Sequence, residues 1–579
     1  MAAAAPAPGQ GLSREAFQEV VASLGFKMEP QDEADFYTMF QRQEQLLRIA
    51  DDLPEYVDPR IGPGSDVAPL SARTYAAPAK KDNPLNAWSH QCEIKDEKAV
   101  ATGILAGRSV VVKDTISVAG VPLTLGTQPY HLSADAPYPI GDVDATVVTR
   151  IIEAGGVLKG TSTCENYCIS GLSCTSASGF VQNPWQHGYA TGGSSSGSAA
   201  LLAINAVKAW RQKRGLPVDD LGEGVDFALG GDQGGSIRMP ASHCGIYGLK
   251  PTHGLVPYTG VSGLHPMIDH VGPMATSVRD IAVLLSAVAG WDGIDCRSNP
   301  TTPLRSAAPA YHELLDQAIA ERRARGDWTP TTAGRGLRVG VLVEGLAAPV
   351  DPSVVAVVRA AAAQFAALGA TVVDVSVPLH SKGTVLWMAT TRAAGADVFA
   401  RNKAPDLLSF PLPNLAPPPL SQAWYDTMRV ANPMVVSTVL SGAYMDDAKR
   451  YPTRHRNKAL MHVAQLRAAF DAALDPSTDG GVDVLLYPIL PTVAKRHPDL
   501  PSMTVLERIQ TLLGVSNNTA SANVTGHPCL ALPGGWAPTA DGKAKLPVGI
   551  QLMGRHNDDL GVLLAASIWE VGGLGLDKE

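Results

Sequence analysis

The sequence predicts an α/β fold in which a central mixed β-sheet is covered by helices on both faces. Three observations support this prediction. From about residue 100 onward, short apolar segments alternate with amphipathic ones. A complete strand–helix–strand unit is evident between residues 337 and 375. Strand-like segments return after a long helix-forming stretch, and a sheet built from such units needs helices on its faces.

The first 85 residues predict an N-terminal helical extension. Residues 1–12 are rich in Ala, Pro and Gly, which favours disorder, and Ser13 is a suitable N-cap for a following helix. Apolar residues then recur at helical spacing and mark one helix face: Phe36, Phe40, Leu47 and Ala50. Two interpretations of this face stay open, packing on the main domain or a homodimer contact. The Pro-rich segment 54–87 is expected to be a linker.

Residues 86–579 are expected to form the main domain. Val110–Lys113 is a short apolar strand that ends in charge, and Asp144–Gly155 has the apolar face of a helix. Val157–Lys159 has the composition of the next strand, and Phe227–Gly230 that of another. These alternating elements place the first part of the sheet between residues 100 and 231.

The strand–helix–strand unit near residue 340 has the clearest boundaries. Leu337–Val343 and Thr371–Val375 are its strands. The helix between them has Asp351 as its N-cap and Pro352 at its first position, and Gly369 ends it. A unit of this kind predicts parallel pairing of its two strands.

Residues 380–475 interrupt this alternation. They are rich in helix formers, so we expect an inserted, mostly helical region. Val482–Tyr487 and Cys529–Leu532 return to a strand pattern and would complete the sheet.

Composition restricts the function classes. A net charge of −8 argues against a nucleic-acid partner, and no apolar run is long enough to span a membrane. The seven cysteines form no CxxC pair, which fits free thiols in the cytoplasm. The spacing of three of them suits no common zinc site: Cys164, Cys168 and Cys174.

Two clusters of serine and glycine, together with one lysine, carry the chemistry. The clusters are Gly192–Gly197 and Gly231–Arg238, and the lysine is Lys113. A serine hydroxyl is a poor nucleophile unless a base removes its proton. Consecutive glycines before Ser236 let backbone N–H groups turn toward a ligand, as an oxyanion hole requires. These groups together predict acyl transfer.

The first cluster also matches the G-x-S-x-G nucleophile elbow, which would make Ser195 the nucleophile. That elbow needs a strand before the serine, whereas Asn183–Gly188 has the composition of a loop. The second cluster follows a predicted strand, so Ser236 is the better candidate. We expect Arg238 to pair with a nearby acid rather than with substrate.

The chain resembles the amidase signature family at motifs within residues 100–280 and 480–575. The matching segments are Val111–Asp114, Gly192–Ala200, Gly230–Ala241, Gly248–Thr252, Leu255–Pro257, Gly272–Met274, Asn523–Pro528 and Pro547–Leu552. The pattern around Gln233 and Thr163–Asn166, with the N-terminal extension, is most similar to bacterial amidases of nitrile-degradation pathways (acylamide amidohydrolases).

The resemblance implies a Ser–Ser–Lys triad. Ser236 matches the family's nucleophile, Ser194 the bridging serine that follows a non-proline cis peptide, and Lys113 the general base. The resemblance also implies an oxyanion hole formed by the N–H groups around three residues: Gln233, Gly234 and Gly235. No metal and no organic cofactor is implied.

The implied relay is chemically coherent. Burial disfavours the charged form of a lysine, so a buried Lys113 would accept a proton from Ser194 while Ser194 takes one from Ser236. Ser236 would attack the carbonyl of a small-molecule amide, and water would hydrolyse the acyl-enzyme. The products would be an acid and ammonia or an amine. Anilides, carbamates and esters are further expected substrates, because the same acyl chemistry serves them.

The chain departs from the family in the spacing of its two serines. Ser194 and Ser236 lie 42 positions apart, more than is usual in the family. The extra stretch, near residues 210–220, is charged and contains Pro and Gly. We expect an external loop between a helix that starts near Gly197 and the strand at Phe227.

Two other functions compete with amide hydrolysis. The first is the amidase subunit of a tRNA-dependent amidotransferase, which would deliver ammonia to a partner subunit. The extension at 1–85 and Gln233 argue against it. The second is a scaffold without catalysis, which the three intact triad positions disfavour. Substrate preference is expected to depend on variable loops, above all residues 380–475.

Overall fold

The structure is a computed structural model, and it describes residues 12–54, 56–62, 70–133, 137–347, 349–404, 409–410, 412, 414–573 and 576. It divides into two compact units, Met1–Pro59 and Arg60–Glu579. Most of the N-terminal tip expected to be disordered, residues 1–11, lies outside the described residues. No helix in the described part of the chain is long and apolar enough to cross a membrane.

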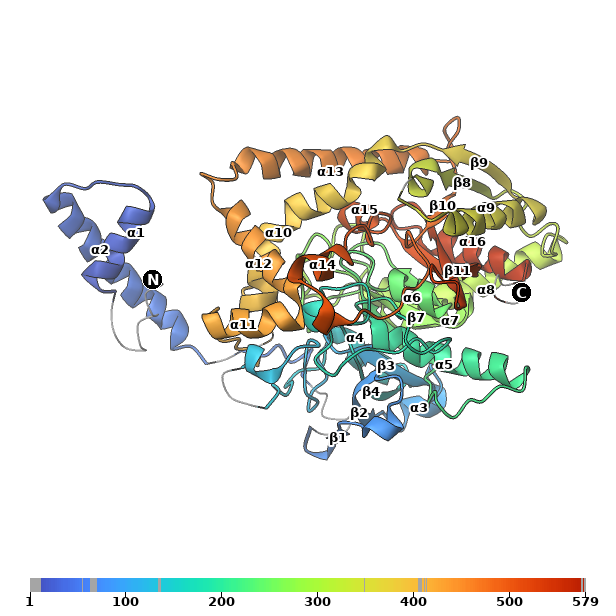
Figure 1. The fold of residues 1–579 in the computed structure, drawn as a ribbon, viewed down its shortest axis with the longest axis horizontal. Coiled ribbons are helices and arrows are strands. Elements are labelled where there is room, and N and C mark those ends of the chain that lie inside the picture. Colours follow the sequence, from blue (N-terminus) through green and yellow to red (C-terminus); the bar gives the residue numbers. More distant parts are fainter. Residues whose placement is uncertain are drawn as a thin grey trace. The chain divides into compact units, whose positions relative to one another are not determined.

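The first unit contains helices α1 (Arg14–Ser23) and α2 (Pro30–Asp51) (Figure 1). Ser13 caps α1, because its hydroxyl oxygen accepts a hydrogen bond from the Ala16 N–H at 3.1 Å. The Phe17 ring packs against Phe40, with ring centroids 5.4 Å apart. The helix predicted to begin near Ser13 is therefore confirmed, and the contact expected of the apolar face of α2 stays a prediction.

The second unit is built on one mixed sheet with the strand order β1-β2-β4-β3-β5-β7-β6-β11-β12-β10-β8-β9. Strand β3 pairs in parallel with β4 and β5, whereas β11 and β12 are antiparallel. The strands are β1 (Tyr75–Ala76), β2 (Trp88–Ile94), β3 (Ser109–Lys113), β4 (Val157–Ser162), β5 (Phe227–Gly231), β6 (Tyr247–Lys250), β7 (Val271–Ala275), β8 (Arg338–Leu342), β9 (Thr371–Val375), β10 (Val484–Pro488), β11 (Cys529–Pro538) and β12 (Lys545–Met553).

The helices of this unit lie between the strands in the sequence and after the last one. Figure 1 shows β2 and β4 at one end of the unit and β8 and β9 at the other, in agreement with the strand order. The helices are α3 (Ala99–Thr102), α4 (Thr146–Glu153), α5 (Ser196–Gln212), α6 (Arg238–Cys244), α7 (Val278–Val288), α8 (Tyr311–Ala324), α9 (Pro352–Ala367), α10 (Gly383–Arg401), α11 (Gln422–Ala431), α12 (Pro433–Asp446), α13 (Thr453–Ala473), α14 (Val505–Gln510), α15 (Ala520–Thr525) and α16 (Asp559–Val571).

Helices cover both faces of the sheet, as predicted. Successive side chains of a strand point to opposite faces, and β3 follows this rule. Val110 and Val112 belong to a core shared with helices α4, α7 and α16, whereas Val111 belongs to a second core shared with α5 and α6. All three valines are fully buried. The α/β fold class is confirmed.

The unit predicted near residue 340 is present with nearly the predicted boundaries. Strands β8 and β9 pair in parallel. Helix α9 begins at Pro352, and the Asp351 carboxylate accepts a hydrogen bond from the Ser353 N–H at 2.9 Å. Gly369 has a φ of 94°, in the left-handed region where a glycine is favoured after a helix.

The stretch from 380 to 475 is mostly helical in its described part, and contains α10 to α13. The segment of the predicted linker that follows residue 69 belongs to the second unit. Within this unit, Arg73 forms a buried ion pair with Asp144 at 2.8 Å. The division of the chain at residues 85 and 86 stays a prediction.

Candidate active site

Lys113 is the last residue of β3 and lies at the carboxyl end of a strand flanked by parallel neighbours. Its side chain is buried, and its Nζ atom donates a hydrogen bond to the Ser194 hydroxyl at 2.8 Å. A Cβ atom placed on Gly231 would lie 3.6 Å from the same Nζ. The Lys113 side chain therefore lies close to residues of both serine–glycine clusters.

The first cluster connects a loop to helix α5. Gly192 has a φ of 75°, and the Gly193–Ser194 peptide is cis. Ser195 precedes α5 and contacts the second cluster twice: its hydroxyl donates to the Gly231 carbonyl at 3.3 Å, and its N–H donates to the Ser236 carbonyl at 3.2 Å. The two clusters thus lie side by side, although they are far apart in the sequence.

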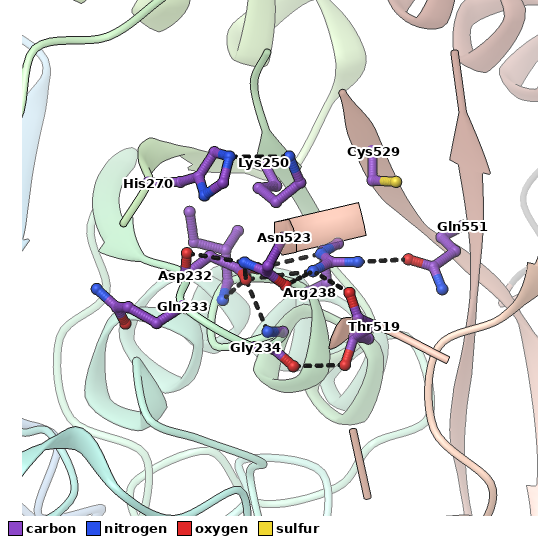
Figure 2. Close-up of polar contacts among 12 residues, drawn as sticks. Asp232, Gln233, Gly234, Arg238, Lys250, His270, Thr519, Asn523, Cys529 and Gln551 are labelled. Carbon is purple, nitrogen blue, oxygen red and sulfur yellow. Dashed lines mark hydrogen bonds and ion pairs between the residues drawn. The ribbon is translucent and has the colours of Figure 1, made fainter. Parts of the chain in front are cut away.

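The second cluster leaves β5 and is held by Asp232. The buried Asp232 carboxylate accepts hydrogen bonds from the Gly235 N–H at 2.7 Å and the Ile237 N–H at 3.2 Å. It also accepts from Asn523 at 2.8 Å and from Arg238, as Figure 2 shows. Arg238 pairs with this acid, as predicted for it. The loop before Ser236 is therefore fixed from its inner side.

Arg238 continues this network into the C-terminal part of the chain. Its guanidinium donates to the Thr519 carbonyl at 3.0 Å, to the Asn523 side chain at 2.8 Å and to the Gln551 side chain at 3.0 Å (Figure 2). Burial opposes ionisation of Asp232, but the attraction of Arg238 outweighs it and holds the pKa of this carboxyl well below its usual range. The pair is therefore charged at neutral pH.

Two more buried ionisable groups flank the site. Burial raises the pKa of Asp114, the neighbour of Lys113, to about 7, although Ser89 and Thr124 donate hydrogen bonds to its carboxylate. Burial lowers the pKa of Lys250 to about 8.

The N–H groups of the loop before Ser236 are not equivalent. The N–H group of Gly235 donates a hydrogen bond to the Asp232 carboxylate. None of the described residues accepts a hydrogen bond from the backbone N–H of Gln233, Gly234 or Ser236. The carbonyls of Gln233 and Gly234 do have partners, the Trp387 indole N–H at 2.7 Å and the Thr519 hydroxyl at 2.5 Å. The loop is thus anchored by its carbonyls while three N–H groups are left for a ligand.

A pocket of about 810 Å³, part of it open to solvent, lies over this loop. It is lined by Gln233, Gly234 and Ser236, by Cys168–Gly171, and by Met239, Leu264, Trp387, Thr391, Arg392, Gly395, Met434, Thr438, Leu512, Val515 and Ser516. Helices α10 and α12, from the region 380–475, contribute to the wall. The expectation that this region determines substrate preference stays a prediction.

Sequence reasoning did not identify several residues at this site. Trp387 and Tyr258 both hold Gln233. The Trp387 indole donates to the Gln233 carbonyl, and the Gln233 side chain donates to the Tyr258 hydroxyl at 2.6 Å. Cys168 has a φ of 57° and lines the pocket. A hydrogen bond from Cys164 and the nearby Lys113 lower the pKa of the Cys168 thiol. Only their position in the fold relates these residues to Ser236, so no local pattern could have indicated them.

The family model described as Amidase matches residues 84–209 and 222–563. The chain belongs to the amidase signature family. The gap between the two matched segments, residues 210–221, falls on the stretch predicted to be an insertion. In the structure this stretch is the end of α5 and a mostly exposed segment before β5, and none of it lines the pocket.

Two curated relatives of this amidase signature protein differ in activity. An enantioselective amidase from Rhodococcus rhodochrous is 35% identical over 503 residues, which cover 86% of this chain and 85% of the relative. A glutamyl-tRNA(Gln) amidotransferase subunit from Synechococcus sp. (strain CC9605) is 33% identical over 482 residues, which cover 81% and 83%.

Solved structures share the fold. A bacterial aryl acylamidase of the amidase signature enzymes superposes with a TM-score of 0.60 at 22% identity, covering 85% of this chain and 90% of that one. The peptide amidase from Stenotrophomonas maltophilia gives a TM-score of 0.58 at 24% identity, covering 91% and 92%. Membership of this family makes the chain a hydrolase that acts on amides.

Proposed function

We propose that this protein hydrolyses carboxylic amides to an acid and ammonia or an amine through an acyl-enzyme on Ser236. The observation that carries the proposal is the 2.8 Å contact between Lys113 Nζ and Ser194 Oγ, buried beside the loop that presents Ser236 to the pocket. A base, a bridging hydroxyl and a hydroxyl nucleophile are the groups that acyl transfer needs.

The proposed reaction begins with two proton transfers. Lys113 acts as the base and takes the proton of Ser194, and Ser194 takes the proton of Ser236. The Ser236 oxygen then attacks the amide carbon, and the carbonyl oxygen becomes an oxyanion. The proton returns through Ser194 to the nitrogen of the leaving group, the C–N bond breaks, and ammonia or an amine departs. Water, activated by the same relay, attacks the acyl-enzyme and releases the acid.

We assign the oxyanion hole to the loop of Gln233, Gly234 and Gly235. The N–H groups of Gln233 and Gly234 are the donors available to a ligand, together with that of Ser236. Gly235 contributes differently, because its N–H binds the Asp232 carboxylate and so fixes the direction of the other donors.

The pocket wall supports a proposal for the substrate class. Apolar side chains surround Ser236 (Ile169, Met239, Leu264, Trp387, Met434, Leu512 and Val515). Such a wall favours amides with an apolar acyl group over glutamine or asparagine. Anilides, carbamates and esters with the same acyl part are further proposed substrates.

A panel of aliphatic and aromatic amides with ammonia detection tests this proposal. We expect the wild-type chain to release ammonia, and Ser236→Ala to lose activity by at least about a thousandfold. Ser178→Ala, at an exposed serine, is the matched control and should retain full activity. Activity that survives Ser236→Ala would refute the assignment of the nucleophile.

A second candidate function is the amidase subunit of a tRNA-dependent amidotransferase. The 33% identity with the glutamyl-tRNA(Gln) amidotransferase subunit of Synechococcus favours it. Glutamine as the only hydrolysed amide, with activity that depends on a partner subunit, would support this candidate. Ammonia release from simple amides by the chain alone would support the first one.

We also propose that the protein acts in the cytoplasm as a homodimer formed through the N-terminal helices. Helix α2 exposes apolar side chains at helical spacing: Phe36, Met39, Phe40, Leu46, Leu47 and Ile49. Of the two interpretations of this face, we propose the contact between two copies, since apolar faces that a unit leaves uncovered mark interaction sites.

A further inference from the structure

Three potential metal ligands converge away from the pocket, where helices α13 and α15 meet the end of β12. Asp471 belongs to α13, His527 follows α15, and His556 follows β12. One ligand atom from each side chain lies within 4.8 Å of the other two. His527 Nε2 is 3.1 Å and His556 Nδ1 is 3.0 Å from the same oxygen, Asp471 Oδ1. None of these residues lines the pocket over Ser236.

The hydrogen bonds of His556 fix the position of its ring proton. Its Nε2 lies 2.7 Å from the carbonyl oxygen of Thr525. A carbonyl oxygen only accepts, so Nε2 carries the proton. In the neutral ring Nδ1 is then unprotonated, and its lone pair points at Asp471 Oδ1.

The same reasoning applies to His527. Its Nδ1 lies 3.0 Å from the Thr525 hydroxyl, which already donates its proton to the Ser521 carbonyl at 2.9 Å. The hydroxyl oxygen therefore accepts, and Nδ1 carries the ring proton of His527. The lone pair of Nε2 is left to face Asp471.

Two imidazole lone pairs and a carboxylate oxygen thus face one another. Adding a proton to each ring would place two cations with ring centroids 3.8 Å apart, which is unfavourable. One cation held between the three atoms satisfies all of them. In protein metal sites a ligating histidine also donates its other N–H to a carbonyl or another oxygen acceptor, which sets the tautomer. Thr525 has this role for both rings.

We propose that Asp471, His527 and His556 form a binding site for a divalent transition-metal ion, with Zn²⁺ as the best match. Two imidazole nitrogens and one carboxylate oxygen are a common zinc ligand set, and tetrahedral bonds of about 2.0–2.1 Å need ligand atoms roughly 3.4 Å apart. The observed separations of 3.0 and 3.1 Å need to open by only a few tenths of an ångström.

The burial of the three residues defines the entry path. The His527 side chain is buried, that of His556 is 14% exposed, and that of Asp471 is 49% exposed. The ion enters from the Asp471 side, where water completes the coordination.

The ion has a structural role in this proposal. It would fasten α13, from the helical region that helps to line the pocket, to α15 and β12 of the body. Thr525, which orients both histidines, lies on α15 two residues after Asn523, and Asn523 donates to Asp232 beneath the loop before Ser236. Metal binding therefore stabilises the element that supports this loop.

Zn²⁺ binding to the full chain tests the site directly. The protein is first dialysed against a chelator, and Zn²⁺ is then titrated by calorimetry, with the bound metal measured by elemental analysis. We expect one ion per chain. Loss of a residue that only hydrogen-bonds to a metal ligand typically weakens metal binding ~10–100-fold. Asp471→Ala and His556→Ala each remove a ligand, so we expect each to weaken Zn²⁺ binding by more than this. His455→Ala, at an exposed histidine of the same helix α13, is the matched control and should bind as the wild type does.

Thermal unfolding and Co²⁺ spectra provide the second readout. Zn²⁺ should raise the Tm of the wild type and of His455→Ala, but not that of Asp471→Ala. Co²⁺ should give the visible absorption of a tetrahedral complex in the wild type and not in Asp471→Ala. Absence of stoichiometric binding, equal affinity in Asp471→Ala, or loss of binding in His455→Ala would each overturn the proposal.

Discussion

Asp232 organises the candidate site although it does not line the pocket. Its carboxylate binds two backbone N–H groups of the loop before Ser236, and it neutralises Arg238. Both side chains of this ion pair are fully buried. A buried charge without its partner is far more costly than an exposed one, so the pair commits the loop to one conformation.

Replacing Asp232 by Asn is predicted to destabilise the fold and impair catalysis. The amide puts a donor where the loop needs an acceptor and leaves Arg238 without its counter-charge. We expect a loss of about 3–5 kcal/mol in the free energy of unfolding at pH 7, measured by urea denaturation. Asp316→Asn is the control, because the ion pair of Asp316 with Arg279 is exposed and its loss should cost less than about 1 kcal/mol.

The stability difference between wild type and Asp232→Asn should depend on pH. The pKa of Asp232 is depressed in the folded protein, so the unfolded chain binds the proton first as the pH falls. The advantage of the wild type is therefore complete above about pH 5 and decreases below it. A difference that stays constant down to about pH 2 would contradict the charged pair.

Gly235 is predicted to tolerate no side chain, unlike its neighbour Gly234. Gly235 has a φ of 124°, and an added Cβ would lie 2.5 Å from the Thr519 hydroxyl oxygen. Gly235→Ala should therefore cost about 2–4 kcal/mol in unfolding free energy. At Gly234 the nearest atoms to such a Cβ, on the Trp387 ring, lie 3.8 Å away. Gly234→Ala should cost less than about 1 kcal/mol, and equal costs for the two variants would refute this reasoning.

At the scale of the elements, helices α10 and α12 connect the helical region to the chemistry. Trp387 on α10 both lines the pocket and donates from its indole to the Gln233 carbonyl. The position of this helix therefore influences the oxyanion loop as well as the space for substrate.

Trp387→Phe is predicted to reduce kcat/KM about fivefold on a good amide substrate while changing Tm little. The reason is the loss of one hydrogen bond that orients the loop, which is typically worth about 1 kcal/mol. Met388→Leu, next to it on α10 and 38% exposed, should leave both quantities unchanged. An unchanged kcat/KM in Trp387→Phe would show that α10 does not position the loop.

Elements with a regular local pattern were predictable, and those defined by distant pairing were not. Strands β3, β8 and β9 and helix α9 are short periodic segments with caps or charges at their ends. Strand β12 contains Pro547 and Gly549, which weaken a strand pattern, and it forms between β10 and β11 because those strands bind it. Strand β11 extends beyond the predicted Leu532 to Pro538 for the same reason.

The candidate site was predictable in part. Lys113, Ser194 and Ser236 stand in segments with unusual composition, and the fold brings Lys113 to Ser194 and places the two clusters side by side. Cys168 and Trp387 have ordinary neighbours in the sequence. Their proximity to Ser236 depends on the packing of the whole second unit, which no local pattern contains.

At the scale of the whole molecule, the chain consists of two compact units. The pocket, the ion pair of Asp232 and the histidine cluster all belong to Arg60–Glu579. The first unit has little burial of its own, since α2 exposes most of its apolar side chains. Under the proposed dimerisation, such a unit would gain stability from a second copy that covers this face.

Deletion of residues 1–59 is predicted to convert a dimer into a monomer with its amidase activity retained. Light scattering after size-exclusion chromatography measures the mass. The double variant Phe36→Ser and Leu47→Ser should have the same effect on the full chain, because it removes two exposed apolar side chains of α2. The same mass for the full and the shortened chain would contradict the homodimer.

The most direct test of the central claim is mass spectrometry of the acyl-enzyme. The protein is mixed with an ester or amide that acylates quickly, quenched in acid and digested. The account predicts one added acyl group on the peptide that contains Ser236, and none in Ser236→Ala. An acyl group on Ser195 or Ser194, or one that persists in Ser236→Ala, would contradict it.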